Sequence, residues 1–195
     1  GSNREKDIKT CIESIEMKPD MVRIYPTLII NDTRLYDMYE EGLYKPLTLY
    51  EAVEISAYIY SLYQVNNINV IRIGLQNTDS INEGEDVKAG PFHPAFRQLV
   101  EERIYYTALL SCLSEKNLEG KHIVIHSPDN LISYFAGQNR ANINKLKEEL
   151  SIKQMSFKKK KDDIIEIYHD NKYLRIIWTC NRGIYVLKKN ICKWI

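Results

Sequence analysis

Two short runs of β-branched and other apolar residues, each interrupted by an arginine, dominate the first half of the chain. The first is MVRIYPTLII at residues 21–30, which contains Arg23, and the second is NVIRIGLQ at residues 69–76, which contains Arg72. Both are typical of β-strands. A buried guanidinium is unfavourable unless it is paired or faces water, so each arginine is expected on a wet face of its strand.

The segment between the two runs has the pattern of one long helix. Thr48 and Glu51 form a capping box at its start, apolar residues then recur at helical spacing, and Asn66 and Asn67 end it. A strand, a helix of about 20 residues and a second strand form a βαβ crossover, which predicts that the two strands pair in parallel.

Alternation along the two strands predicts one apolar and one polar face. In the second run Ile71, Ile73 and Leu75 share the apolar face, against which the crossover helix should pack. The polar faces should border a wet cavity or a ligand. They carry Arg23, Tyr25 and Thr27 in the first run and Arg72, Gly74 and Gln76 in the second.

Other patterns in the first half predict helices at residues 4–16, 32–42 and 95–117. A polar loop at residues 77–94 leaves the carboxyl end of the second strand, where α/β folds place their ligands. His93 lies where this loop meets the last helix, and Arg97 lies at the start of that helix. Two roles stay open for His93: a cap of the helix, or contact with a substrate together with Arg97.

The composition changes near Leu118–Gly120, which predicts a boundary between a unit at residues 3–118 and a second one at residues 119–195. The second unit has the pattern of an α+β module. It comprises predicted strands at 121–127, 152–160 and 163–169, helices at 129–137 and 140–150, and a hairpin at 172–188.

Composition and charge argue against several classes of protein. The net charge of +1 gives no whole-chain attraction to nucleic acid or membranes, and no apolar stretch is long enough to span a membrane. The cysteines Cys11, Cys112, Cys180 and Cys192 are scattered without a C-x-x-C pair, which argues against a metal site and for reduced thiols in the cytoplasm. Nucleotide-binding and hydrolase motifs are absent, and no residue is assigned a catalytic role.

Residues 8–110 resemble the closing part of the radical SAM barrel in the Elongator-catalytic-subunit-like branch, which overlaps with coproporphyrinogen-oxidase-like iron–sulfur oxidoreductases. The resemblance is carried, in order, by R-I-Y-P-T-L, the Y-x-P-L spacing and I-R-I-G-L-Q. It implies the last βα units of a partial (β/α)6 barrel, an α/β fold. In this family a [4Fe–4S] cluster and S-adenosylmethionine generate a 5′-deoxyadenosyl radical, and Elongator-type members act on tRNA wobble uridine.

The resemblance also assigns residues to the site. By position, Arg72, Gly74, Leu75 and Gln76 would help to bind S-adenosylmethionine, and Arg23 and Tyr25 would face the substrate. A structural network with carboxylates of neighbouring strands is the alternative for both arginines. The family's three-cysteine cluster loop is absent from this sequence, so we expect a C-terminal part that binds no cofactor and is inactive alone.

The segment YFAGQNRANINKLKEEL resembles the helix–loop–helix of a KH domain, whose G-x-x-G loop clamps a nucleic-acid backbone. The second glycine is replaced, because the quartet begins at Gly137 and ends at Arg140. Local positive charge comes from Arg140, Lys145 and a lysine run that includes Lys158, Lys159 and Lys160.

These features support two hypotheses of different classes. The first is the C-terminal part of a radical SAM enzyme, in which an exposed barrel edge would also favour a homo-oligomer. The second is a non-catalytic module whose KH-like tail binds tRNA, another RNA or a protein.

Overall fold

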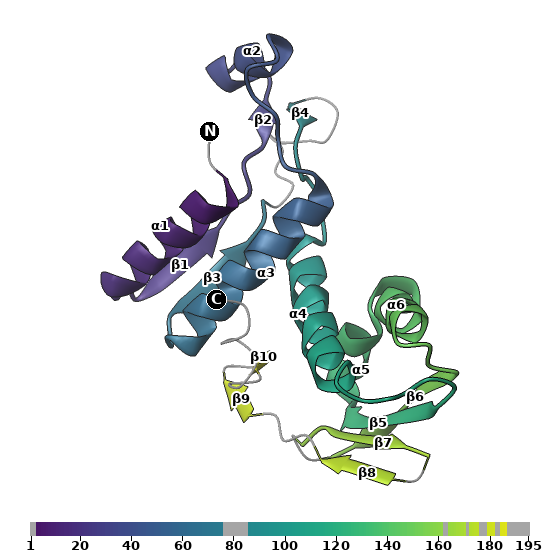
Figure 1. Ribbon diagram of the computed structural model, residues 1–195. Helices are drawn as coiled ribbons and strands as arrows, with labels where there is room; N and C mark the ends of the chain where they lie inside the picture. Colours follow the sequence, from purple (N-terminus) through teal and green to yellow (C-terminus); the bar gives the residue numbers. More distant parts are fainter. Residues whose placement is uncertain are drawn as a thin grey trace. The chain divides into compact units, whose positions relative to one another are not determined.

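The computed structural model describes residues 3–75, 86–161, 164–170, 172–175, 179–181 and 184–186. It has a mixed α/β architecture that divides into two compact units, Gly1–Val100 and Glu101–Ile195. The division falls within one helix, α4 (Phe96–Leu113). Figure 1 shows the elements of both units, and each unit is described by itself.

The first unit is built around a parallel pair of strands, β1 (Met21–Ile24) and β3 (Asn69–Ile73). Two helices, α1 (Arg4–Glu16) and α3 (Leu49–Val65), cover one face of this pair (Figure 1). The predicted parallel βαβ crossover is therefore confirmed. The capping box of α3 is also confirmed, because the Thr48 hydroxyl accepts a hydrogen bond from the Glu51 amide and the Glu51 carboxylate accepts one from the Thr48 amide.

The first apolar run is not one strand. It breaks after β1 at Pro26, which has no amide hydrogen and cannot continue the ladder. The chain resumes as a short strand, β2 (Ile29–Ile30), which pairs antiparallel with β4 (Val87–Ala89). The strand β4 lies inside the segment predicted as a loop, so that prediction is wrong over these residues. A short helix, α2 (Arg34–Glu40), follows β2 with Thr33 as its N-cap.

The predicted faces of the second run are wrong in one respect. The register pairs Val22 with Val70 and Arg23 with Arg72, so Ile71 is an extra residue without a partner in β1. This β-bulge interrupts the alternation. As a result Val70 and Ile73 are buried together, whereas Ile71 is exposed.

The second unit contains a four-stranded sheet in the order β6-β5-β7-β8. Its strands are β5 (His122–Pro128), β6 (Gln154–Lys160), β7 (Glu166–His169) and β8 (Lys172–Arg175). The strands β5 and β6 run parallel because two helices, α5 (Asp129–Ala136) and α6 (Ala141–Glu149), connect them. These helices and α4 cover one face of the sheet, where Tyr105, Leu109, Phe135, Leu146 and Ile125 belong to the core.

A short antiparallel hairpin joins β9 (Thr179–Asn181) to β10 (Ile184–Val186). It agrees with the predicted hairpin over residues 179–181 and 184–186, whereas residues 176–178 of the strand expected before the turn lie outside the described residues. Among the described residues, no helix is long and apolar enough to cross a membrane.

Candidate functional site

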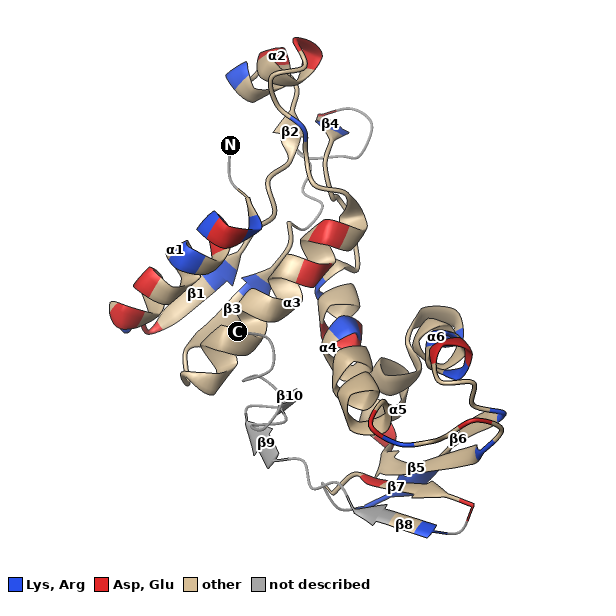
Figure 2. Cartoon of the chain, viewed as in Figure 1, with Lys and Arg blue, Asp and Glu red and all other residues tan. Residues whose placement is uncertain are grey.

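Arg23 and Arg72 are register partners on neighbouring parallel strands. Both are exposed, whereas the next pair, Ile24 and Ile73, is buried. Since partners in a ladder share a face, the arginines lie on the face opposite the helices. Figure 2 shows the basic segments of β1 and β3 side by side. The polar face predicted for both arginines is thus present, and Tyr25, the next residue of this face in the first run, is 41% exposed.

No carboxylate is recorded within ion-pair distance of either arginine in the described part of the chain. Strands in a sheet are about 4.8 Å apart, so the two guanidinium groups place two positive charges close together. Like charges opposite each other destabilise a sheet. An anion bound between them would remove this repulsion, and guanidinium forks bind carboxylates and phosphates in bidentate geometry.

The covered side holds this arrangement in place through α1 and α3. The Ser14 and Tyr63 hydroxyls are 2.6 Å apart and connect the two helices. Cys11 is buried beside them, and burial raises the pKa of its thiol. It is therefore a packed neutral thiol and no candidate nucleophile.

Gly74 ends β3 in a conformation that requires glycine. Its φ is +75°, and a Cβ there would lie 2.8 Å from the Cβ of Phe96. Its amide donates to the Ile24 carbonyl at 2.9 Å, which extends the parallel ladder by one bond. The glycine therefore has a packing role, and its assignment to the cofactor stays a prediction. Gln76, assigned to the same site, lies outside the described residues.

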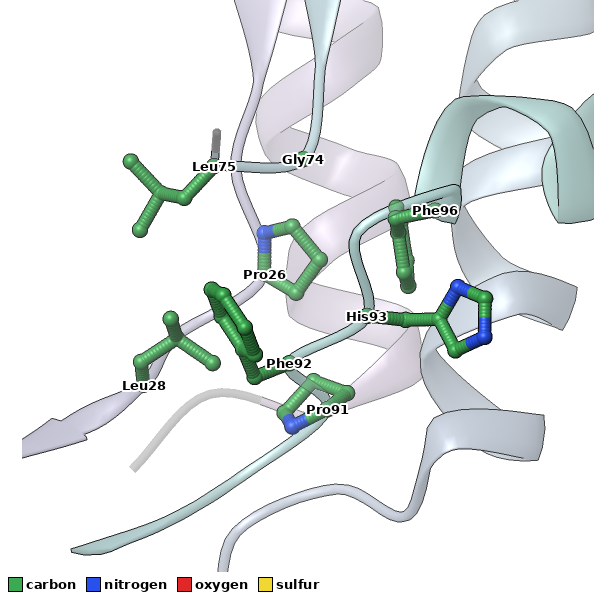
Figure 3. Close-up of a pocket in the computed structure, with 8 residues that line it drawn as sticks. All are labelled: Pro26, Leu28, Gly74, Leu75, Pro91, Phe92, His93 and Phe96. Atoms are coloured by element: carbon green, nitrogen blue, oxygen red, sulfur yellow. The ribbon is translucent and has the colours of Figure 1, made fainter. Parts of the chain in front are cut away.

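Leu75 and His93 border a small pocket with Pro26, Phe92 and Phe96, shown in Figure 3. The pocket has room for about one water molecule, so it cannot enclose a cofactor. The His93 ring points away from Pro26 and Phe92 (Figure 3). Its Nδ1 accepts a hydrogen bond from the Ala95 amide at 3.1 Å, a local contact in the turn just before α4 begins at Phe96. Arg97 is exposed on the first turn of α4.

A larger open pocket of about 450 Å³ borders Arg23 and Tyr25. Tyr44 and Lys45, from the loop before α3, also line it, together with residues of α1 and α3 that include Asp7, Ser56 and Tyr63. The pocket therefore lies against the two helices and does not include Arg72. This volume is that of a small-molecule site. Our sequence analysis did not assign Tyr44 or Lys45, although the Y-x-P-L spacing that contains them was part of the family resemblance.

In the second unit the Gly137–Arg140 quartet forms a tight turn between α5 and α6. Gly137 has φ +73°, and a Cβ there would lie 2.9 Å from the Asn142 side chain. The Gln138 amide donates to the carboxylate of Glu102 at 3.1 Å. One amide of the KH-like loop is thus already bound by an anionic group of the chain itself, and Arg140 is exposed.

The basic residues assigned to nucleic acid differ in their surroundings. Lys145 lies 3.9 Å from Glu149 and above the Tyr106 ring, Lys159 is 2.9 Å from Asp129, and Lys160 is 2.8 Å from Glu166. Lys158 is exposed, with no ion pair recorded among the described residues. Their assignment to RNA stays a prediction.

The described residues include no group of three or more His, Cys, Asp or Glu side chains that could hold a metal ion. Cys11 is packed in the first unit and Cys112 in the second, where burial raises the pKa of its thiol to about 11. Described thiols of this chain therefore do not fit an iron–sulfur cluster, which needs converging thiolates.

Comparison with protein families gives the identity of the arginine-bearing segment. Residues 19–106 match the Radical_SAM C-terminal domain. This segment is a Radical_SAM C-terminal domain. The match confirms the resemblance carried by the two strands.

Curated relatives agree with this Radical_SAM C-terminal domain. The tRNA uridine(34) acetyltransferase of Methanocaldococcus jannaschii is 46% identical over 65 residues, which are 32% of this chain and 12% of that protein. Elongator complex protein 3 of Homo sapiens is 38% identical over 61 residues, which are 30% of this chain and 11% of that protein. The chain thus covers only a small part of these relatives. No solved structure matches it.

Proposed function

We propose that this chain is part of a radical S-adenosylmethionine enzyme that modifies a uridine of tRNA, and that Arg23 and Arg72 line its reaction cavity. The observation that carries the proposal is the pairing of these arginines on the open face of β1–β3, within the segment that matches the family. Two guanidinium groups on a polar strand face, with no ion pair recorded among the described residues, suit an anionic ligand.

Arg72 fits the carboxylate of S-adenosylmethionine, because its exposed guanidinium has no carboxylate partner recorded among the described residues. Arg23 and Tyr25, both exposed, face the substrate or cosubstrate. Gly74 and Phe96 hold the end of β3 so that Arg72 keeps its place. S-adenosylmethionine and the cluster, when bound, supply the radical.

The iron–sulfur cluster has to be held by residues other than Cys11 and Cys112, because each of these thiols is packed within its own unit. We therefore propose that these 195 residues catalyse no radical reaction unless a cluster-bearing part is supplied. The tRNA substrate is inferred from the relatives, whose names specify uridine 34 of tRNA.

Purified chain, alone and combined with a cluster-loaded radical SAM part of the same enzyme, tests this proposal. We expect 5′-deoxyadenosine and a modified tRNA uridine, detected by mass spectrometry, from the combination alone. The proposal would be contradicted by 5′-deoxyadenosine formation by the chain alone, or by a combination that cleaves S-adenosylmethionine while leaving tRNA unchanged.

An RNA-binding module without catalysis is the second candidate. It is favoured by the exposed Lys158 and Arg140 of the second unit. A tRNA gel shift with wild type and a variant carrying alanine at residues 158–161 tests it: binding should be salt-dependent and lost in the variant. Binding no stronger than that of a neutral control protein would contradict it.

A further inference from the structure

The four-stranded sheet of the second unit has one covered and one uncovered face. Ile123, Ile125 and Ile167 point to the helix-covered core and are fully buried. The residues that alternate with them point the other way. On β5, β6, β7 and β8 these include Val124, His126, Ser156, Lys158, Glu166, Tyr168 and Tyr173, all of which are partly or fully exposed.

Three of these side chains form a row of rings across the three strands β5, β7 and β8. The ring centroids of His126 and Tyr168 are 4.5 Å apart, and those of Tyr168 and Tyr173 are 5.2 Å apart. Tyr173 is 49% exposed. His126 and Tyr168 stand on β5 and β7, the two central strands, so the row is centred on the sheet.

Polar contacts hold this row and add charge beside it. The Glu166 carboxylate accepts hydrogen bonds from the Tyr168 hydroxyl at 3.3 Å and from the Tyr173 hydroxyl at 3.2 Å. Lys160 lies 2.8 Å from the same carboxylate and compensates its charge. Lys158 is the register partner of His126 on the edge strand β6 and is exposed, so it lies on the same face as the rings.

We propose that this face of the sheet binds single-stranded RNA by stacking bases on the ring row His126–Tyr168–Tyr173, with Lys158 binding phosphate. Sheet faces with aromatic side chains on central strands stack two or three bases, and each base–aromatic contact is sequence-tolerant. The site is separate from the Gly137–Arg140 loop. The inference rests on the second candidate function, RNA binding by the second unit, and deepens it by naming the surface and the kind of RNA.

The surroundings favour RNA over a protein partner. The described residues of this face combine ring faces with hydroxyl groups and an adjacent lysine, which suits bases and phosphates together. Burial and the nearby Lys158 lower the pKa of His126 below its usual value. A neutral imidazole at pH 7 can stack on a base without competition from a charged hydration shell.

The test is fluorescence anisotropy of the full chain with a labelled oligouridine of about twelve nucleotides, and with an RNA duplex of the same length. We expect the single strand to bind more tightly than the duplex, because only its bases are free to stack. Tyr168→Leu and Tyr173→Leu should each weaken binding at least about fivefold. Tyr173→Phe, which keeps the ring, should bind like wild type.

Two further variants test whether the positive charge of Lys158 contributes to RNA binding. Lys158→Gln should weaken binding at low salt and reduce the salt dependence, whereas Lys9→Gln, an exposed lysine of α1, should bind like wild type. Circular dichroism verifies the fold of each variant. If a leucine variant unfolds, the results for Tyr173→Phe and Lys158→Gln still decide the test.

Three results would overturn the proposal. The first is no binding of oligouridine by the wild type, which would leave the face to a protein partner or to no ligand. The second is equal binding of duplex and single strand. The third is unchanged binding by folded leucine variants together with loss in Arg140→Gln, which would place the RNA on the loop instead.

Discussion

Arg23 and Arg72 are directly opposite each other in the parallel pair β1–β3, on the face that the helices leave open. The pairing depends on the bulge at Ile71, because without this extra residue Arg23 would face Ile71 instead. The bulge thus places two like charges together, an arrangement that is unfavourable for the strands themselves. Bulges occur often beside binding sites, where they redirect a side chain.

Gly74→Ala should destabilise the first unit more than Gly42→Ala. Both glycines have positive φ, +75° and +72°, so both substitutions carry the left-handed penalty of about 1–2 kcal/mol. Only at Gly74 does the new methyl group meet another atom, the Cβ of Phe96 at 2.8 Å. We expect an additional loss of about 1–3 kcal/mol in urea unfolding for Gly74→Ala. Equal losses would show that the contact with Phe96 is unimportant.

Asn142→Ala should destabilise the second unit by about 1–2 kcal/mol. The Asn142 amide donates to the Glu102 carbonyl at 3.0 Å and to the Tyr134 carbonyl at 3.2 Å, so it links α6 to α4 and α5. Asn144 on the same helix is exposed and is the matched control, with an expected change within about 0.5 kcal/mol. Similar unfolding midpoints for both variants would contradict this link.

The stability of the second unit should fall between neutral pH and about pH 5 because of His126. Its pKa is lowered by burial and by Lys158, partly offset by Glu166. As the pH falls, His126 therefore binds a proton in the unfolded chain before it does so in the folded chain. The stabilisation that is present above the usual histidine pKa of about 6.5 is lost as the pH falls through the lower pKa of His126 in the folded chain.

His126→Phe keeps a ring but cannot titrate, so its stability should depend less on pH over this range. His122→Gln, which changes an exposed histidine on the same strand, should retain the wild-type dependence. Parallel urea titrations at several pH values measure both. An unchanged slope for His126→Phe would show that this histidine does not contribute.

The first unit should self-associate or bind another chain through the region near β1. Met17 and Met21 are 77% and 56% exposed, and Ile12 of α1 is 47% exposed. Exposed apolar side chains beside a strand favour association. Light scattering should show a species larger than the monomer, and Met21→Lys should reduce it. A monodisperse monomer of the wild type would contradict the prediction.

Local patterns were sufficient to predict most elements. The α3 helix could be predicted because its capping box and apolar spacing are both local, and the parallel pairing followed from the crossover. The break at Pro26 was missed although proline is a local feature, because the apolar residues on both sides looked continuous. The pairing of β2 with β4 joins residues almost 60 positions apart, which no local pattern specifies.

The site was predictable only in part. Which residues are polar on β1 and β3 could be inferred, but the bulge that aligns Arg23 with Arg72 depends on tertiary packing. The contacts of Lys159 and Lys160 with Asp129 and Glu166 depend on the sheet order, so a run of lysines in the sequence overstated the free positive charge. The His126–Tyr168–Tyr173 row joins three strands in the same way.

The most direct measurement is equilibrium binding of S-adenosylmethionine to the complete, cluster-loaded enzyme and to its Arg72→Ala variant, together with thermal unfolding of both. We expect the variant to bind the cofactor at least about tenfold more weakly and to unfold at nearly the same temperature, because an exposed arginine beside another arginine adds little stability. Unchanged binding with a large drop in unfolding temperature would contradict the account and show that Arg72 is a structural residue.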